Sequence, residues 1–398
     1  MSEKTCDYFL DTPPDRHGTN SIKWDRQCRG YGCSDLTPLA IADMDFPVAP
    51  EIRAALERRA AHPVYGYACM GPGYISAVTG WYQRRHDWAV QPQWVVPSCA
   101  VVTALGFSID ALTQPGDGVI VFTPVYNPFY IIVEGSGRRL VECPLLLEEG
   151  RYAIDYQCVE AAMKAGAKVL LLCNPHNPVG RVWRREELER LAALCVRYDV
   201  TILSDEVHGD ITFDGHRYTP MAALDDARER TAVFTAPSKT FNVAGVSTSN
   251  LIVPNEGLRK KIQDSLMTKF IMGTNLFGYV LCEAAYTHGE AWLDAILAYL
   301  DRNRRAVTGT LRQKAPGIGV TELEGSYLMW LDMRCFGLGG KELCRLLAEE
   351  CGVLVNDGTE YRAPEGFVRI NIACCGQVIS RFLDRLVQFY ARHTQQKQ

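Results

Sequence analysis

The chain of 398 residues predicts an α/β fold built around a mostly parallel sheet. The runs 168–173, 200–204 and 249–253 are short and dominated by apolar residues, as expected of strands that are covered on both faces. Segment 186–198 alternates charged residues with Leu and Ala at helical spacing. Strands that alternate with such helices are typical of a sheet with helices on both faces.

The first part of the chain predicts an irregular arm. Residues 1–50 are rich in Pro, Gly and Asp, with one short strand expected at 39–41. The elements expected after the arm are helices at 51–61, from Gly73 to Tyr82, at 101–112, 126–134 and 186–198, and strands at 94–96, 119–122, 168–173, 200–204, 233–235 and 249–253.

The composition changes beyond about residue 286. The elements expected there are a long helix at 292–311, strands at 327–331 and 367–371, and helices at 341–351 and 380–393. A chain of this length has room for two domains. The sequence therefore predicts an N-terminal arm at 1–50, a large domain at 51–285 and a smaller α/β domain at 286–398, to which the arm returns.

Composition and charge argue against several classes of protein. The hydrophobic content of 47% and charged content of 22% are ordinary for a globular protein, and a net charge of −4 gives no reason to expect binding to nucleic acid or to an anionic membrane. Residues 1–25 are polar, so we expect no signal peptide, and no apolar run reaches membrane-spanning length. The 15 cysteines show neither a CxxC pair nor metal-ligand spacing. We therefore expect reduced thiols, no metal and a cytoplasmic location.

One lysine, Lys239, lies where a buried strand gives way to a turn. The apolar residues 232–234 precede it, and Thr, Asn and Gly follow it. Burial lowers the pKa of a lysine, which suits an amine that must be neutral and nucleophilic, as in a Schiff base with a carbonyl compound. A surface lysine after a strand is the alternative interpretation.

A carboxylate and a histidine lie at another strand end, and ligands of open α/β sheets bind beyond the carboxyl ends of strands. Asp205 ends a buried strand, where an unpaired carboxylate is expensive. A protonated pyridine nitrogen would pair with it, and a helix N-cap or a structural ion pair is the alternative. His208 would donate to a ring oxygen or be a satisfied buried histidine.

Three more strand ends carry residues that fit a ligand with a pyridine ring and a phosphate. Asn177 lies in a doubled Asn-Pro turn, and Tyr126 follows a strand, where it would stack on a planar ring or pack in the core. A turn and a helix start at 98–102 would offer backbone N–H groups to a phosphate. Together these strand ends fit one cofactor, pyridoxal 5′-phosphate.

The chain resembles the fold type I pyridoxal-phosphate enzymes of the class I/II aminotransferase superfamily. Within them it is most similar to the MalY/PatB branch of cystathionine β-lyases and cysteine-S-conjugate β-lyases. The segments that carry the resemblance, in family order, are 15–19 with Trp24-Asp25, 42–46, 65–67, 123–130, the NPxNPxG turn at 174–180, 204–208, 238–242 and 367–371. The resemblance implies the transferase fold of these enzymes, with a mostly parallel sheet of seven strands in the large domain.

The resemblance also implies a role for each candidate residue. Lys239 would form the Schiff base, Asp205 would pair with the pyridinium, and Arg369 would clamp the substrate α-carboxylate, a surface ion pair being the alternative. The further cofactor contacts implied are Asn177 and His208 at the ring hydroxyl, Tyr126 stacked on the ring, and Ser238 with the amides of Ala100 and Val101 at the phosphate. Tyr67 would reach the phosphate of the neighbouring subunit, which implies a homodimer with active sites at the subunit interface.

Two positions depart from typical aminotransferases. A tyrosine commonly lies three residues after the aspartate, where this chain has His208, and an arginine commonly follows the lysine by eight residues, where it has Ser247. Both substitutions suit the lyase branch. The missing arginine leaves the expected phosphate site less positive.

The resemblance implies α,β-elimination, in which L-cystathionine or a related cysteine S-conjugate gives a thiol, pyruvate and ammonia. An aminotransferase would use the same lysine, aspartate and arginine, so the sequence leaves that activity open. A regulatory protein that uses the fold to bind a protein partner is a third interpretation. The candidates for the lining beyond the substrate β-carbon are Met44, Tyr327 and the loop 270–276.

Overall fold

The computed structural model describes residue 8, residues 10–29 and residues 36–395. Parts of the expected N-terminal arm, at 1–7, 9 and 30–35, lie outside these ranges. Within them, no helix is both long enough and apolar enough to span a bilayer.

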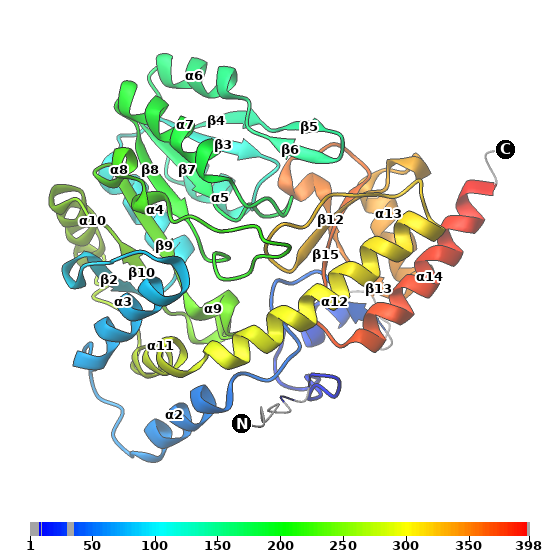
Figure 1. The fold of residues 1–398 in the computed structure, drawn as a ribbon, viewed down its shortest axis with the longest axis horizontal. Coiled ribbons are helices and arrows are strands. Elements are labelled where there is room, and N and C mark those ends of the chain that lie inside the picture. Colours follow the sequence, from blue (N-terminus) through cyan, green and yellow to red (C-terminus); the bar gives the residue numbers. More distant parts are fainter. Residues whose placement is uncertain (1–7, 9, 30–35, 396–398) are drawn as a thin grey trace.

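A mixed sheet of seven strands forms the centre of the molecule (Figure 1). In spatial order its strands are β2 (Val95–Ser98), β10 (Ser249–Ile252), β9 (Thr231–Thr235), β8 (Thr201–Asp205), β7 (Val169–Cys173), β3 (Gly118–Thr123) and β4 (Arg139–Pro144). Only β10 runs antiparallel to its neighbours in this sheet. The predicted mostly parallel sheet of seven strands is therefore confirmed.

Side-chain alternation along the central strands divides the core between the two faces of the sheet. Ile120 and Phe122 of β3 pack with helices α6 (Tyr156–Lys164) and α7 (Arg185–Arg197), whereas Val119 and Val121 pack on the opposite face. That opposite face is covered by α4 (Val101–Leu112), α5 (Pro128–Gly135) and α10 (Glu256–Thr268). Because every residue of β3, β7 and β9 is buried, these strands need apolar side chains at consecutive positions.

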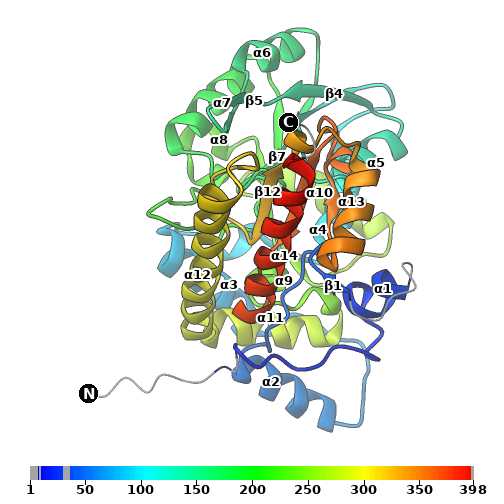
Figure 2. The same ribbon diagram turned by 90° about the vertical axis from the view of Figure 1, so that its right-hand side faces the viewer.

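The C-terminal part of the chain forms a smaller antiparallel sheet (Figure 2). Its strands, in spatial order, are β11 (Gly319–Val320), β12 (Leu328–Asp332), β15 (Phe367–Asn371) and β14 (Asn356–Asp357). The long helix α12 (Glu290–Lys314) packs against α14 (Gly376–Gln395), and α13 (Gly340–Leu346) continues into a short π-helix, Leu347–Cys351. The domain boundaries near residues 50 and 285 stay a prediction.

The remaining helices and strands lie outside these two sheets. They are α1 (Gln27–Arg29), α2 (Pro50–Ala61), α3 (Pro72–His86), α8 (Asp225–Arg228), α9 (Pro237–Thr240), α11 (Leu276–His288), β1 (Thr37–Pro38), β13 (Val353–Leu354) and the hairpin of β5 (Leu146–Glu148) and β6 (Arg151–Ala153). The prediction of a strand at 39–41 is wrong, because the strand of the arm is β1, which pairs in parallel with β13. Beyond it, the backbone N–H of Leu39 donates to the carbonyl oxygen of Leu354 in β13, and the carbonyl oxygen of Leu39 accepts from the backbone N–H of Asn371 in β15.

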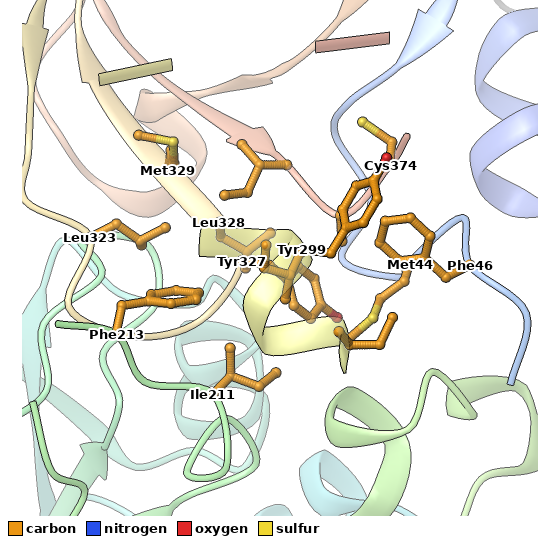
Figure 3. Close-up of a cluster of buried hydrophobic side chains, with 14 of the residues drawn as sticks. Met44, Phe46, Ile211, Phe213, Tyr299, Leu323, Tyr327, Leu328, Met329 and Cys374 are labelled. Carbon is orange, nitrogen blue, oxygen red and sulfur yellow. The ribbon is translucent and has the colours of Figure 1, made fainter. Parts of the chain in front are cut away.

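The arm belongs to the main hydrophobic core. Met44 and Phe46 are almost fully buried, and they lie in one cluster with Tyr299 of α12 and Tyr327 beside β12 (Figure 3). The rings of Phe46 and Tyr299 meet edge to face with centroids 5.1 Å apart. This packing fixes residues 42–46 between the two sheets.

A buried ion pair joins the turn 174–182 to the segment before β12. The carboxylate of Glu324, fully buried, accepts from Nε of Arg181 at 2.9 Å and from the backbone N–H of Val182 at 2.9 Å. Arg151 adds a salt bridge to the same carboxylate at 2.7 Å. Two arginine contacts on one buried carboxylate, one of them from the buried Arg181, make this turn a fixed part of the structure.

We expect Glu324→Gln to destabilise the protein by about 2 kcal/mol, because it removes one of the two carboxylates that pair with the buried Arg181 and leaves only the pair with Glu187. The measurement is the thermal unfolding midpoint of the cofactor-free protein. The control is Glu189→Gln, which breaks an exposed pair with Arg185 and is expected to change stability by less than about 1 kcal/mol. Equal midpoints for the two variants would contradict this prediction.

Candidate active site

A cavity of about 1180 Å³ opens at the carboxyl ends of β3, β7, β8 and β9. All residues predicted for the site line this cavity except Tyr67. Those that line it are Ala100, Val101, Tyr126, Asn177, Asp205, His208, Ser238, Lys239 and Arg369. A site at this edge of the sheet is the usual arrangement in open α/β folds.

Lys239 lies in the one-turn helix α9, directly after β9. Its side chain is partly buried, and Nζ donates a hydrogen bond to the carbonyl oxygen of Ala42 at 2.7 Å. Burial, followed by the positive charge of Arg369, lowers the pKa of Lys239 to about 8. The amine is therefore deprotonated far more readily than that of a surface lysine.

Asp205 is the last residue of β8 and is 3% exposed. Its Oδ1 accepts from the backbone N–H of Val207 at 3.2 Å, and the carboxylate has no salt bridge to any residue in the described ranges. Burial raises the pKa of Asp205 to about 6. The carboxylate thus forms no structural ion pair in the described ranges, its hydrogen bond to Val207 is of the capping kind, and it is suited to a cation that enters the cavity.

Asn177, His208 and Tyr126 surround the same part of the cavity. The side-chain oxygen of Asn177 accepts from Arg369 at 3.1 Å, which directs its amide nitrogen to other acceptors. Nδ1 of His208 is buried without a partner in the described ranges, and burial holds the pKa of His208 well below its usual value. Burial raises the pKa of Tyr126 to about 12, so its hydroxyl stays protonated.

Arg369 enters the cavity from β15 and is 4% exposed. Besides Asn177, its guanidinium donates to the carbonyl oxygen of Ala40 at 2.8 Å and to Asn356 at 2.7 Å, and its Nε atom has no partner in the described ranges. No carboxylate of the described residues forms a salt bridge with it, so the surface ion pair considered above is wrong. A guanidinium with five N–H groups keeps donors for an anionic ligand.

The end of the cavity at the start of α4 is suited to a phosphate. Ala100 is the N-cap of the 12-residue helix α4, so the first backbone N–H groups of that helix face this end with the positive end of its dipole. Ser238, Ser247 and Thr248 also line it, and the buried hydroxyl of Thr248 has no hydrogen-bond partner in the described ranges. Ser247 occupies the position where an arginine was noted to be missing.

The main-chain contacts of Ala42 and Met44 were not predicted, although the sequence singled out 42–46 as part of the resemblance. The carbonyl oxygen of Ala42 accepts from Lys239 and, at 3.0 Å, from the hydroxyl of Tyr327. The side-chain oxygen of Asn242 accepts from the backbone N–H of Met44 at 2.9 Å. Main-chain acceptors of this kind have no sequence signature.

An ion cluster holds this segment to the arm. Arg16 forms salt bridges with Asp43 at 2.8 Å and with Asp45 at 2.7 Å, and the fully buried Lys23 pairs with Asp45 at 2.9 Å. Arg16, Asp43 and Asp45 also line the cavity. The arm therefore forms part of the wall of the site.

The predicted pocket-lining candidates have different positions. Met44 lines the cavity. Tyr327 is fully buried behind Ala42 and does not line it, and Ile271 and Met272 of the loop 270–276 line a separate cavity of about 630 Å³. Tyr67 projects fully into solvent, so a single chain does not bring it to the site.

The residues present fit pyridoxal 5′-phosphate. Asp205 offers a buried carboxylate without a cation, Lys239 offers an amine with a lowered pKa, and the start of α4 offers backbone donors at the far end. In the described part of the chain no group of three or more His, Cys, Asp or Glu residues is arranged to hold a metal ion.

The fold and the residues of the cavity fit the class of pyridoxal-phosphate enzymes, and comparison with known families gives the same class. Residues 34–386 match the family Aminotransferase class I and II. The chain belongs to this family.

Its relatives narrow the assignment within that class. Cystathionine beta-lyase PatB of Bacillus subtilis is 40% identical over 92% of this chain and 95% of its own length, and Protein MalY of Escherichia coli is 32% identical over 90% and 93%. Among solved structures, cystalysin from Treponema denticola, which contains a pyridoxal 5′-phosphate cofactor, is 34% identical with a TM-score of 0.93, covering 97% of this chain and 99% of its own.

We expect the pKa of Lys239 to respond in opposite directions to its two charged neighbours. Arg369→Gln removes a positive charge and should raise this pKa above 8, whereas Asp43→Asn removes a negative charge and should lower it. The measurement is the pH dependence of acylation of Lys239 in the cofactor-free protein, read by mass spectrometry. Arg138→Gln, remote from the cavity, is the control, and shifts of the same sign in both variants would contradict the prediction.

Proposed function

We propose that this protein is a pyridoxal-phosphate-dependent carbon–sulfur β-lyase. It cleaves L-cystathionine, or a related cysteine S-conjugate, with water to give a thiol (homocysteine from cystathionine), pyruvate and ammonia. The observation that carries this proposal is that Lys239, Asp205 and Arg369 line one cavity in a chain that is 40% identical to a cystathionine β-lyase.

When bound, pyridoxal 5′-phosphate supplies an electron sink for the electron pair left at the substrate α-carbon. Asp205 pairs with the ring nitrogen, which also compensates the cost of its own burial. Tyr126 would stack on the ring, and Asn177 and His208 would contact the ring hydroxyl. Ser238 and the backbone N–H groups of Ala100 and Val101 hold the phosphate at the start of α4.

Lys239 holds the cofactor covalently in the resting protein and then serves as the base. With a pKa near 8, its free amine is able to accept the α-proton close to neutral pH. The carbonyl oxygen of Ala42 holds the resulting ammonium in place through the hydrogen bond already present at 2.7 Å. Arg369 binds the substrate α-carboxylate with its remaining donors and so orients the Cα–H bond toward Lys239.

The protein acts as a homodimer in this proposal. Tyr67 is fully exposed, and exposed apolar side chains surround its segment, namely Val64, Tyr65 and Met70. Apolar side chains exposed together are typical of protein interfaces. Tyr67 of the partner subunit then supplies a hydroxyl to the phosphate end, which has no arginine at position 247. The cytoplasmic location expected from the sequence stays a prediction.

We expect the purified holoenzyme to release one pyruvate for each L-cystathionine consumed, and Lys239→Ala to lose this turnover by at least about 1000-fold, because it removes the base and the covalent link to the cofactor. The measurement follows pyruvate together with the visible absorbance of the bound cofactor. The control is Lys260→Ala, an exposed lysine paired with Asp264 on α10. Visible absorbance without pyruvate, but with a keto acid formed from an amino acid that has no β-leaving group, would show transamination instead.

A hybrid dimer tests the position of Tyr67. Tyr67→Ala and Lys239→Ala are each expected to impair the homodimer, yet random reassociation of the two variants should restore about a quarter of wild-type activity, because half of the dimers then carry one intact site. The measurement is pyruvate release after mixing under dissociating conditions. No recovery would mean that Tyr67 acts in its own subunit or has no role.

A further inference from the structure

Tyr361 brings into the cavity a hydroxyl group to which the proposed function gives no role. Its side chain is 2% exposed and lines the cavity, and its Oη atom has no hydrogen-bond partner among residues 8, 10–29 and 36–395. The Oη atom itself is not fully buried, so it is accessible from the cavity. A group that faces a ligand cavity in this state is suited to donate to the ligand.

The position of Tyr361 is fixed from several directions. It ends a 3-10 helix, Gly358–Tyr361, and its carbonyl oxygen accepts from the hydroxyl of Tyr130 at 2.8 Å. Its ring packs edge to face on Trp330 with centroids 5.8 Å apart. The next residue, Arg362, forms salt bridges with Glu134 and Glu142, on α5 and β4. A donor held this firmly does not need to be ordered when substrate binds.

Tyr361 lies on the substrate side of the cavity. The guanidinium carbon of Arg369 is 4.9 Å from the centre of its ring. Burial raises the pKa of both Tyr126 and Tyr361, but the next influence on Tyr126 is Asp205 at the cofactor end, whereas the next influence on Tyr361 is Arg369. Tyr361 is therefore next to the proposed carboxylate clamp.

Apart from Tyr126, whose ring is proposed to stack on the cofactor, the other hydroxyl groups near the cavity have partners or positions that take them away from the substrate. Tyr327 donates to the carbonyl oxygen of Ala42, and Thr19 donates to the carbonyl oxygen of Arg16. Ser238 and Thr248 lie at the phosphate end. Tyr361 thus offers the substrate a free donor beside Arg369.

We propose that Tyr361 is a catalytic residue whose Oη donates a hydrogen bond to the substrate sulfur as the Cβ–S bond breaks. The proposal rests on the β-lyase function above. The electron pair of the Cβ–S bond goes to sulfur, the α-proton goes to Lys239, and a Cα=Cβ double bond forms. The departing thiolate then takes a proton from the Lys239 ammonium or from water.

Tyr361 serves this step as a donor and keeps its own proton. Because burial raises its pKa further above neutrality, the hydroxyl stays protonated across the working pH range. A hydrogen bond to the negative charge that develops on sulfur is stronger than one to the neutral thioether. The interaction therefore favours the transition state over the bound substrate.

The test compares two leaving groups in the holoenzyme. Tyr361→Phe removes the hydroxyl and keeps the ring beneath Arg369. For S-ethyl-L-cysteine, whose ethanethiolate is a poor leaving group, we expect kcat/KM to fall about tenfold, mainly in kcat. For β-chloro-L-alanine, whose chloride leaves readily and is a weak hydrogen-bond acceptor, we expect a fall of less than about twofold.

Controls separate this role from a structural one. Tyr198→Phe removes a hydroxyl that donates to Glu160, remote from the cavity, and should leave both substrates unchanged. Across a series of S-aryl-L-cysteines, the rate should depend more steeply on the pKa of the leaving thiol in Tyr361→Phe than in wild type. This slope compares substrates within one variant, so a partial loss of folded protein does not affect it.

Three results would overturn the inference. An equal loss with both substrates would place the hydroxyl at the shared part of the substrate, such as the carboxylate. An unchanged kcat/KM with both, or an unchanged slope, would mean that the hydroxyl takes no part. If wild type released no pyruvate from either substrate, the β-lyase function itself would be wrong, and the inference would fail with it.

Discussion

The burial of the Asp205 carboxylate is the constraint on which the site depends. The backbone groups of β8 pair with those of β7 and β9, and the carboxylate at its end receives one N–H, from Val207, and no salt bridge from the residues that the structure describes. Its raised pKa reports the cost. The compensating charge has to come from the cavity, and the cofactor that we propose brings that charge on its ring nitrogen. The carboxylate at this strand end therefore depends on a ligand for its compensating positive charge.

The arm also offsets positive charge in the cavity. Lys239 and Arg369 put positive charge on one wall of the cavity, and Asp43 acts against it. Asp43 is itself held by Arg16 in a cluster of two cations and two anions that includes Lys23 and Asp45. Because this cluster is balanced, it fixes the wall without adding net charge. The carbonyl oxygen of Ala42, the acceptor for Lys239, is fixed with it.

Local patterns made much of this fold predictable. Helix α4 and strand β15 have the predicted bounds, because a helix start after a turn and a five-residue strand depend on neighbours in sequence. The edge strand β4, with exposed Arg139 and a partly apolar face, has no such pattern and was not predicted.

The residues of the candidate site also fall into a group that the sequence predicts and a group that it does not. Residues at strand ends, such as Asp205 and Lys239, were predictable because the topology gathers them at one edge. The carbonyl oxygen of Ala42 and the hydroxyl of Tyr361 depend on contacts between distant segments, which a single sequence does not display. The exposure of Tyr67 is meaningful only when a second subunit is considered.

The parallel pairing of β1 with β13 has a consequence for how the chain is made. Thr37 pairs with Val353, so the arm finds its partner strand only when most of the chain has left the ribosome. The central sheet, whose strands lie between residues 95 and 252, is complete well before that. Contacts of such long sequence separation form late and slowly. The nascent protein therefore passes through a stage with a folded sheet and an open site, during which the arm and its apolar residues need protection from aggregation.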